Sequence, residues 1–345
     1  MPVESLPVVN VEALLLTDDN SNNQKTNERV QQTSQQLLDA LVEWGFLYIS
    51  GHCVDINLQN NLEAASREFF NLPLEVKQQI NMKLGKHAWR GYFPPGDELT
   101  SGIPDSKEGI YFGTELADNH PKVVSETPLH GSNLWPCQYP ELKTIVLQYM
   151  NAMEQLGHAL MRGLAIGLGL DEKYFQNSFG KDPTLLFRIF NYPPSSQKVG
   201  WGVGEHTDYG FLTILKTDNN PGLEVLSPTL KWIEVPFIPN TFIINIGDQL
   251  EIATNGLLKA TPHRVRIQRE ENRLSWPFFF DPDWDALLRR VDLTHWNNSN
   301  EWPSRKPGKR WDGKDLKTMQ NQKYGDYLLD KVSRCFPHLF KAVVT

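Results

Sequence analysis

The chain has 345 residues, of which 40% are hydrophobic and 22% are charged, a composition typical of globular proteins. Its 34 basic and 41 acidic side chains give a net charge of −7, which offers no general attraction to phosphate backbones or anionic membranes. We therefore expect neither a nucleic-acid partner nor a membrane partner. The three cysteines are too few and too scattered for a disulfide framework or a CxxC zinc site.

The N-terminal sequence MPVESLPVVNVEALLL has no basic segment ahead of its apolar run, so it does not resemble a signal peptide. The most apolar helical stretch, residues 158–170, is interrupted by Arg162 and is too short to span a bilayer. Because scarce cysteines also suit a reducing compartment, we expect a cytoplasmic protein. The oligomeric state leaves no recognisable pattern in the sequence.

The first part of the chain is predicted to be mainly helical. A short apolar run at Val8–Val11 suits an edge strand, and residues 28–44 carry apolar side chains at helical spacing. Between glycines, residues 45–51 are aromatic and aliphatic, which favours a buried strand. Two further helices are expected over residues 58–70 and 74–80.

Residues 89–118 are rich in glycine, proline and aromatic side chains and show no clear period, so we expect an irregular loop with short strands. The longest helical pattern covers residues 139–170 and predicts a scaffold helix in the core. A final helix is expected near residues 326–335.

From Pro183 onward the pattern changes to short β-type runs at residues 185–192, 211–216, 223–226, 232–235, 242–246, 263–267 and 274–280. Between these runs, Asn220-Pro-Gly222 and Asn255-Gly256 are typical of hairpin turns. Regular short strands of this kind predict an antiparallel sandwich or barrel.

A candidate metal site lies within this β-rich half. His206 and Asp208 are separated by one residue, so on a strand both side chains would project from the same face. His263 follows 55 residues later, at the start of another expected strand. Two histidines and one aspartate form the facial triad that suits non-haem Fe(II), with coordination positions left open.

A candidate carboxylate receptor follows the second histidine. Arg273 and Ser275 are again spaced to share one strand face, where a guanidinium can bind a carboxylate through two hydrogen bonds and a hydroxyl can add a third. Upstream, Tyr192 can place its phenol beside the same group. We expect this receptor to face the same interior as the metal.

With these motifs in place, the chain resembles the isopenicillin N synthase-like Fe(II)/2-oxoglutarate-dependent dioxygenases. The resemblance rests on the segments WGFLYISGH (44–52), HTD (206–208), INIGD (244–248), HRV (263–265) and RLS (273–275), in that order. It implies a mainly β fold with flanking helices, in which a double-stranded β-helix, or jelly roll, is joined to an N-terminal helical layer.

The resemblance also implies how the chain is divided. We expect an N-terminal region over residues 1–130, scaffold helices over 131–182, the jelly-roll core over 183–285, and a C-terminal loop and helix over 286–345 that closes the site.

The resemblance implies a role for each candidate residue. His206, Asp208 and His263 would bind Fe(II), while Arg273 and Ser275, assisted by Tyr192, would hold 2-oxoglutarate. With O₂ as oxidant, a small-molecule substrate would be hydroxylated, desaturated or cyclised as 2-oxoglutarate is converted to succinate and CO₂.

Two further positions follow from the same resemblance. The segment around Arg90 and Tyr92 corresponds to a region that contacts the substrate in related enzymes. Phe190 is a departure, because plant members commonly have asparagine two residues before the tyrosine.

Three other functions remain open from the sequence. An oxidase of the isopenicillin N synthase type uses Fe(II) and O₂ without 2-oxoglutarate, and its Arg-x-Ser pair binds the substrate itself. A non-catalytic module could recognise a ligand on the same scaffold, although an intact triad argues against it. A zinc hydrolase is less consistent, since zinc sites often use three histidines or two with glutamate.

Overall fold

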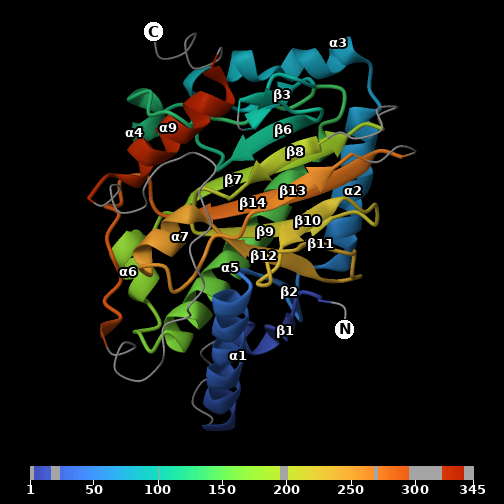
Figure 1. Cartoon of the computed structure of the whole chain (residues 1–345). Coiled ribbons are helices and arrows are strands. Elements are labelled where there is room, and N and C mark those ends of the chain that lie inside the picture. Colours follow the sequence, from blue (N-terminus) through green and yellow to red (C-terminus); the bar gives the residue numbers. More distant parts are fainter. Residues whose placement is uncertain are drawn as a thin grey trace.

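The computed structural model describes residues 4–16, 24–100, 102–194, 201–267, 271–294 and 321–337. Two β-sheets form its centre (Figure 1). The larger sheet has the strand order β1-β2-β12-β9-β14-β7-β6-β3, with β1 (Val8–Asn10), β2 (Phe46–Ser50), β12 (Phe242–Ile246), β9 (Leu212–Thr217), β14 (Arg273–Asp281), β7 (Thr184–Tyr192), β6 (Glu108–Gly113) and β3 (Gly91–Phe93). The smaller sheet has the order β11-β10-β13-β8, with β11 (Trp232–Glu234), β10 (Leu223–Leu226), β13 (His263–Arg266) and β8 (Trp201–His206).

The chain alternates between the two sheets from β7 onward. Strands β7, β9, β12 and β14 belong to the larger sheet, whereas β8, β10 and β13 belong to the smaller one, where β11 pairs with β10. All pairings among these strands are antiparallel. This is the arrangement of a double-stranded β-helix, and the predicted fold class is confirmed.

Helices cover the outer face of the larger sheet (Figure 1). The longest, α5, packs against α1, α2 and β14. The described helices are α1 (Gln24–Glu43), α2 (Ile56–Phe70), α3 (Leu74–Lys77), α4 (Pro121–Val124), α5 (Glu141–Gly167), α6 (Tyr174–Phe179), α7 (Asp248–Ala253) and α9 (Tyr324–Cys335). Shorter 3-10 helices lie at Glu12–Leu15, Gln78–Ile80 and Met82–Ala88. A separate two-stranded ribbon pairs β4 (Leu99–Thr100) with β5 (Ile103–Pro104).

The apolar period of α5 explains how the helices are held. Leu142, Val146, Tyr149, Met153 and Leu156 recur every three or four residues, which places them on one face of the helix. All of them are buried against the larger sheet or the neighbouring helices. No helix within the described ranges combines the length and apolar character that crossing a bilayer requires.

Strand β14 shows how the larger sheet serves two interiors. Leu274, Trp276 and Phe278 belong to the core beneath the helices. The alternate residues Arg273 and Ser275 face a cavity between the two sheets. Neighbouring side chains on a strand point to opposite faces. The same strand therefore packs apolar side chains into the core and places polar side chains in the wall of the cavity.

Two local predictions need correction. Asn220-Pro-Gly222 joins β9 of the larger sheet to β10 of the smaller one, so it is a crossover rather than a hairpin. Asn255-Gly256 follows α7 and is not a hairpin either. Both errors share a cause, because strand pairing over long distances decides what a local turn connects. The segment 89–118 contains short strands, as expected, and the longest of them, the six-residue β6, is buried and pairs with β7.

The contact of α5 with β14 yields a stability prediction. Helix propensity alone would make Gly157→Ala stabilising by about 1 kcal/mol. A Cβ atom at Gly157, however, would lie 2.3 Å from Cδ2 of Phe280. We therefore expect destabilisation by roughly 1–3 kcal/mol through overpacking, measured as the free energy of unfolding in urea. The control is Gln148→Ala, at an exposed position of the same helix, and a stabilised Gly157→Ala variant would contradict this packing.

Candidate metal and 2-oxoglutarate site

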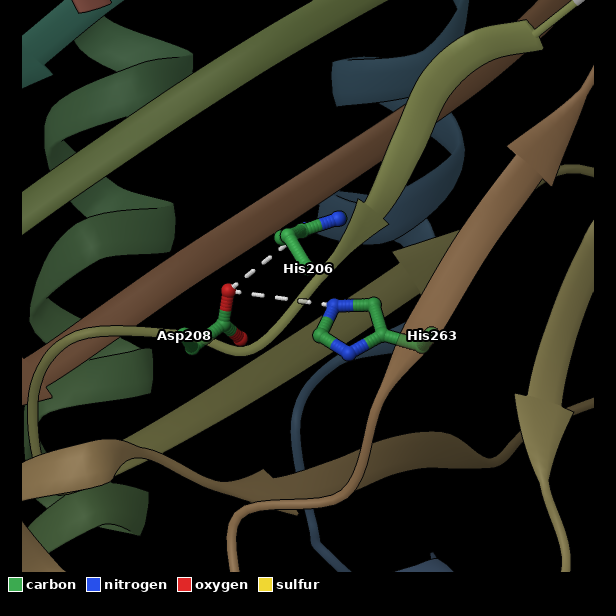
Figure 2. Close-up of side chains that lie close together, drawn as sticks. All are labelled: His206, Asp208 and His263. Atoms are coloured by element: carbon green, nitrogen blue, oxygen red, sulfur yellow. Dashed lines mark ion pairs between the residues drawn. The ribbon is translucent and has the colours of Figure 1, made fainter. Parts of the chain in front are cut away.

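Two histidines from neighbouring strands meet at one end of the smaller sheet. His206 ends β8 and His263 begins β13, and the two residues are direct partners in the strand register. Their ring centroids are 4.1 Å apart. Asp208 faces both rings from one side, with its Oδ1 atom 3.9 Å from Nε2 of His206 and 3.8 Å from Nε2 of His263 (Figure 2). One potential ligand atom of each residue lies within 4.8 Å of the others.

Each imidazole is oriented by its second nitrogen. Nδ1 of His206 lies 2.8 Å from the carbonyl oxygen of Gly204, and Nδ1 of His263 lies 3.2 Å from that of Thr261. Because a carbonyl only accepts hydrogen bonds, Nδ1 carries the proton and Nε2 keeps its lone pair. Burial lowers the pKa of both imidazoles, that of His263 to about 4. Both rings are therefore neutral at pH 7, as metal ligands must be.

The carboxylate of Asp208 is fixed by the larger sheet. Its Oδ2 atom accepts hydrogen bonds from Thr213 Oγ1 at 2.5 Å and from Asn245 Nδ2 at 2.6 Å. Burial alone would raise the pKa of Asp208, but the adjacent His263 and His206 and these two hydrogen bonds outweigh it and lower the pKa. The group stays ionised, with Oδ1 directed toward the histidines.

The route by which Asp208 reaches this position differs from the prediction. Strand β8 ends at His206, so Asp208 lies in the following loop and not on the same strand face. The loop is held by the start of α7, where the backbone N–H of Asp248 donates to the carbonyl of Asp208 at 2.8 Å. The Asp248 carboxylate accepts from the Thr207 hydroxyl at 2.8 Å and lies 3.6 Å from Lys331 Nζ. Asp248 is the first residue of this helix.

The predicted carboxylate receptor is assembled from two adjacent strands. Arg273 on β14 is the register partner of Tyr192 on β7, and its guanidinium lies 5.1 Å from the centre of the Tyr192 ring. The Ser275 hydroxyl lies 3.5 Å from the Tyr192 phenol oxygen. Arg273 is 1% exposed, and its Nε and Nη1 atoms find no hydrogen-bond partner among the described residues. A buried cation with unused donors fits the carboxylate of a bound molecule.

One cavity of about 110 Å³ contains both groups. Its wall includes His206, Asp208 and His263 together with Tyr192, Arg273 and Ser275, so the structure brings all six predicted residues together. Sequence inspection missed Thr213 and Asn245, which are polar residues inside otherwise apolar strands. A polar side chain in such a strand is the signal that could have pointed to them.

The structure does not bring Arg90 and Tyr92 to this cavity, and neither residue is among those that line it. Arg90 donates to the carbonyls of Ala88 and Leu129 and to Asn133, while the Tyr92 phenol donates to Glu108. Both are at most 2% exposed. Their hydrogen bonds hold the first part of the chain together, and substrate contacts by these two residues stay a prediction that the geometry of this cavity does not support. Phe190 does line the cavity.

Comparison with known proteins agrees with this geometry. Residues 183–282 match the family model of the 2OG-Fe(II) oxygenase superfamily, and residues 6–138 match the N-terminal model of non-haem dioxygenases in morphine synthesis. The chain is 40% identical to a probable iron/ascorbate oxidoreductase of Dictyostelium discoideum, over 98% of this chain and 96% of that protein. The chain belongs to the 2OG-Fe(II) oxygenase superfamily. It is thus an iron- and 2-oxoglutarate-dependent oxygenase, with O₂ as co-substrate.

The chain is also similar to a hydroxylase and to a protein of known structure. It is 33% identical to a homoarginine-6-hydroxylase of Oryza sativa subsp. japonica, over 84% of this chain and 89% of that enzyme. Its fold matches that of a full-length Neurospora crassa protein, solved in complex with alpha-KG and thymine, at a TM-score of 0.73 and 24% identity, over 95% of this chain and 96% of that one.

The hydrogen bond from Asn245 to Asp208 predicts a change in metal affinity. In Asn245→Ala, Oδ2 loses a donor and the carboxylate is less firmly oriented. We expect Fe(II) affinity to fall by about 10- to 100-fold, measured by anaerobic calorimetry. Asn177→Ala, at an exposed position of α6, is the control. Unchanged affinity in Asn245→Ala would contradict this role.

Proposed function

We propose that this oxygenase hydroxylates a small organic molecule inside the cavity between its sheets. His206, Asp208 and His263 bind the iron, and Arg273, Ser275 and Tyr192 bind the distal carboxylate of 2-oxoglutarate. The observation that carries the proposal is the buried guanidinium of Arg273 in the same cavity as the triad, because its Nε and Nη1 have no hydrogen-bond partner among the described residues. A structural arginine at this depth would have protein acceptors, as Arg90 does.

The residues of the cavity prepare it for this reaction. When bound, Fe(II) and 2-oxoglutarate supply the oxidation of a C–H bond to an alcohol by O₂, with release of succinate and CO₂. The two histidines and Asp208 would hold the metal, and a triad of this kind would leave it positions for other ligands. Arg273 fixes the co-substrate by charge and by paired donors.

Apolar side chains keep water from the reacting centre. The same cavity is lined by Leu186, Phe190, Val203 and Phe279. The first three belong to a second apolar cluster, separate from the core beneath the helices. Excluding water protects a strong oxidant from side reactions and strengthens electrostatic contacts with the bound molecules.

Arg273→Met tests the co-substrate site. We expect the affinity for 2-oxoglutarate to fall by about 10- to 100-fold, since a charge-assisted pair of hydrogen bonds is lost, while Fe(II) still binds. The measurement is a titration of the anaerobic Fe(II) protein, following the visible charge-transfer band of the complex. Arg162→Met, on α5 and outside this cavity, serves as the control. If the unaltered protein gave no band, an iron oxidase that does not use 2-oxoglutarate would be the better description.

His206→Ala tests the metal site directly. With one ligand removed we expect Fe(II) binding and succinate formation to be lost together, measured by calorimetry and by succinate release. A screen of free amino acids including homoarginine, other small carboxylic acids, the primary amides of both, and pyrimidine bases including thymine then identifies the substrate. Mass analysis of the product separates hydroxylation, which adds one oxygen atom, from desaturation or ring closure, which removes hydrogen. Retained iron-dependent turnover in His206→Ala would refute the assignment of the ligands.

A further inference from the structure

A second guanidinium lines the cavity, and the reaction described so far does not use it. Arg188 lies in the middle of β7, four residues before Tyr192. Side chains at every second position of a strand share a face, and Leu186, Arg188, Phe190 and Tyr192 all line the cavity accordingly. Arg188 is therefore on the same wall as the co-substrate receptor, farther along the strand.

Two aromatic rings hold the Arg188 side chain. Its guanidinium carbon lies 4.1 Å from the ring centre of Tyr111 and 4.8 Å from that of Phe279. Such contacts attract a cation and orient its plane, but they use none of its N–H groups. The head group is thus positioned while its donors remain available.

Protein acceptors around Arg188 are already engaged. The nearest carboxylate is Glu98, whose Oε1 lies 3.6 Å from Nη1, too far for a normal hydrogen bond. Glu98 also forms an ion pair with Lys107 at 2.8 Å and accepts from the Tyr111 phenol. Nε of Arg188 is buried and has no hydrogen-bond partner in the described part of the chain.

Two other deeply buried cations among the described residues, both lysines, have carboxylate partners at short distance. Lys107 forms ion pairs with both Glu98 and Asp105, and Lys77 forms one with Glu108, with an N···O distance of 2.8 Å. Buried cations are costly unless they are well paired. Arg188 has only the long contact with Glu98 and an Nε without a partner among the described residues, so it can still take an acceptor from outside the protein. Under the proposed function, Arg273 finds its acceptor in 2-oxoglutarate. An acceptor for Arg188 would then have to be a different bound molecule.

We propose that Arg188 binds a carboxylate of the primary substrate, so that this oxygenase acts on small carboxylic acids, free amino acids among them. The inference rests on the proposed function, because it takes Arg273 as already assigned to 2-oxoglutarate. A carboxylate matches the fork of a guanidinium through two hydrogen bonds. A substrate held at this wall would lie beside Phe279 and have its other end free to reach toward the histidines, which line the same cavity.

The test compares acids with their primary amides, which have nearly the same shape and no charge. Each pair is added to the unaltered protein with saturating 2-oxoglutarate. Binding is measured by ligand-observed NMR on the anaerobic protein, and turnover by succinate release. We expect at least one acid to bind and stimulate turnover, and its amide to be about tenfold weaker or worse. Should no acid bind, or should an amide or a pyrimidine base match the best acid, the proposal is overturned.

Two substitutions then connect this preference to Arg188. In Arg188→Met we expect the KM of the best acid to rise by about tenfold or more and the preference over its amide to disappear. Arg188→Lys keeps the charge and should restore part of the preference. Arg162→Met is again the control, and thermal melting reports on folding. An acid preference that is unchanged in folded Arg188→Met would contradict the assignment.

The 2-oxoglutarate titration separates this inference from the proposed function. We expect Arg188→Met to give the charge-transfer band at the same 2-oxoglutarate concentration as the unaltered protein. If that band appears but acids have no advantage, the inference about Arg188 fails and the proposed function stands. A missing band in the unaltered protein would remove both.

Discussion

The position of Asp208 is the constraint on which the rest of this structure depends. Its carboxylate lies between two histidines of the smaller sheet and two hydrogen-bond donors of the larger sheet, Thr213 on β9 and Asn245 on β12. Its Oδ2 atom accepts both hydrogen bonds, and its Oδ1 atom faces the imidazoles. A buried charge is tolerated here because neutral donors and an eventual cation compensate it. The two sheets must therefore keep their spacing for the site to exist.

The alternation of side chains along β7 and β14 supplies the other half of the site. On one face these strands carry Phe187, Ile189 and Trp276, which belong to the core beneath the helices. On the other they carry arginine, serine and tyrosine toward the cavity. The rigid packing beneath α5 thus fixes the polar groups above it, which is how a fold can hold a charged receptor in an apolar setting.

Much of the site could be predicted from the sequence because its signals are local or have a characteristic spacing. The pair Arg273 and Ser275 follows from strand periodicity alone. His206, Asp208 and His263 were selected by residue type and order, although Asp208 lies beyond the strand. Thr213, Asn245 and Asp248 were missed as supporting residues, since their roles depend on which strands and helices become neighbours. The sequence could not place Arg90 for the same reason, because a cation in an irregular segment gives no sign of whether it binds a ligand or the protein's own carbonyls.

An anaerobic crystal structure with Fe(II) and 2-oxoglutarate would show the occupied site. We predict a metal bonded to Nε2 of His206, Nε2 of His263 and Oδ1 of Asp208, with the distal carboxylate of 2-oxoglutarate on Arg273 and Ser275. Arg188 should remain free of the co-substrate. A metal bound elsewhere, or 2-oxoglutarate bound through Arg188 in place of Arg273, would contradict this prediction.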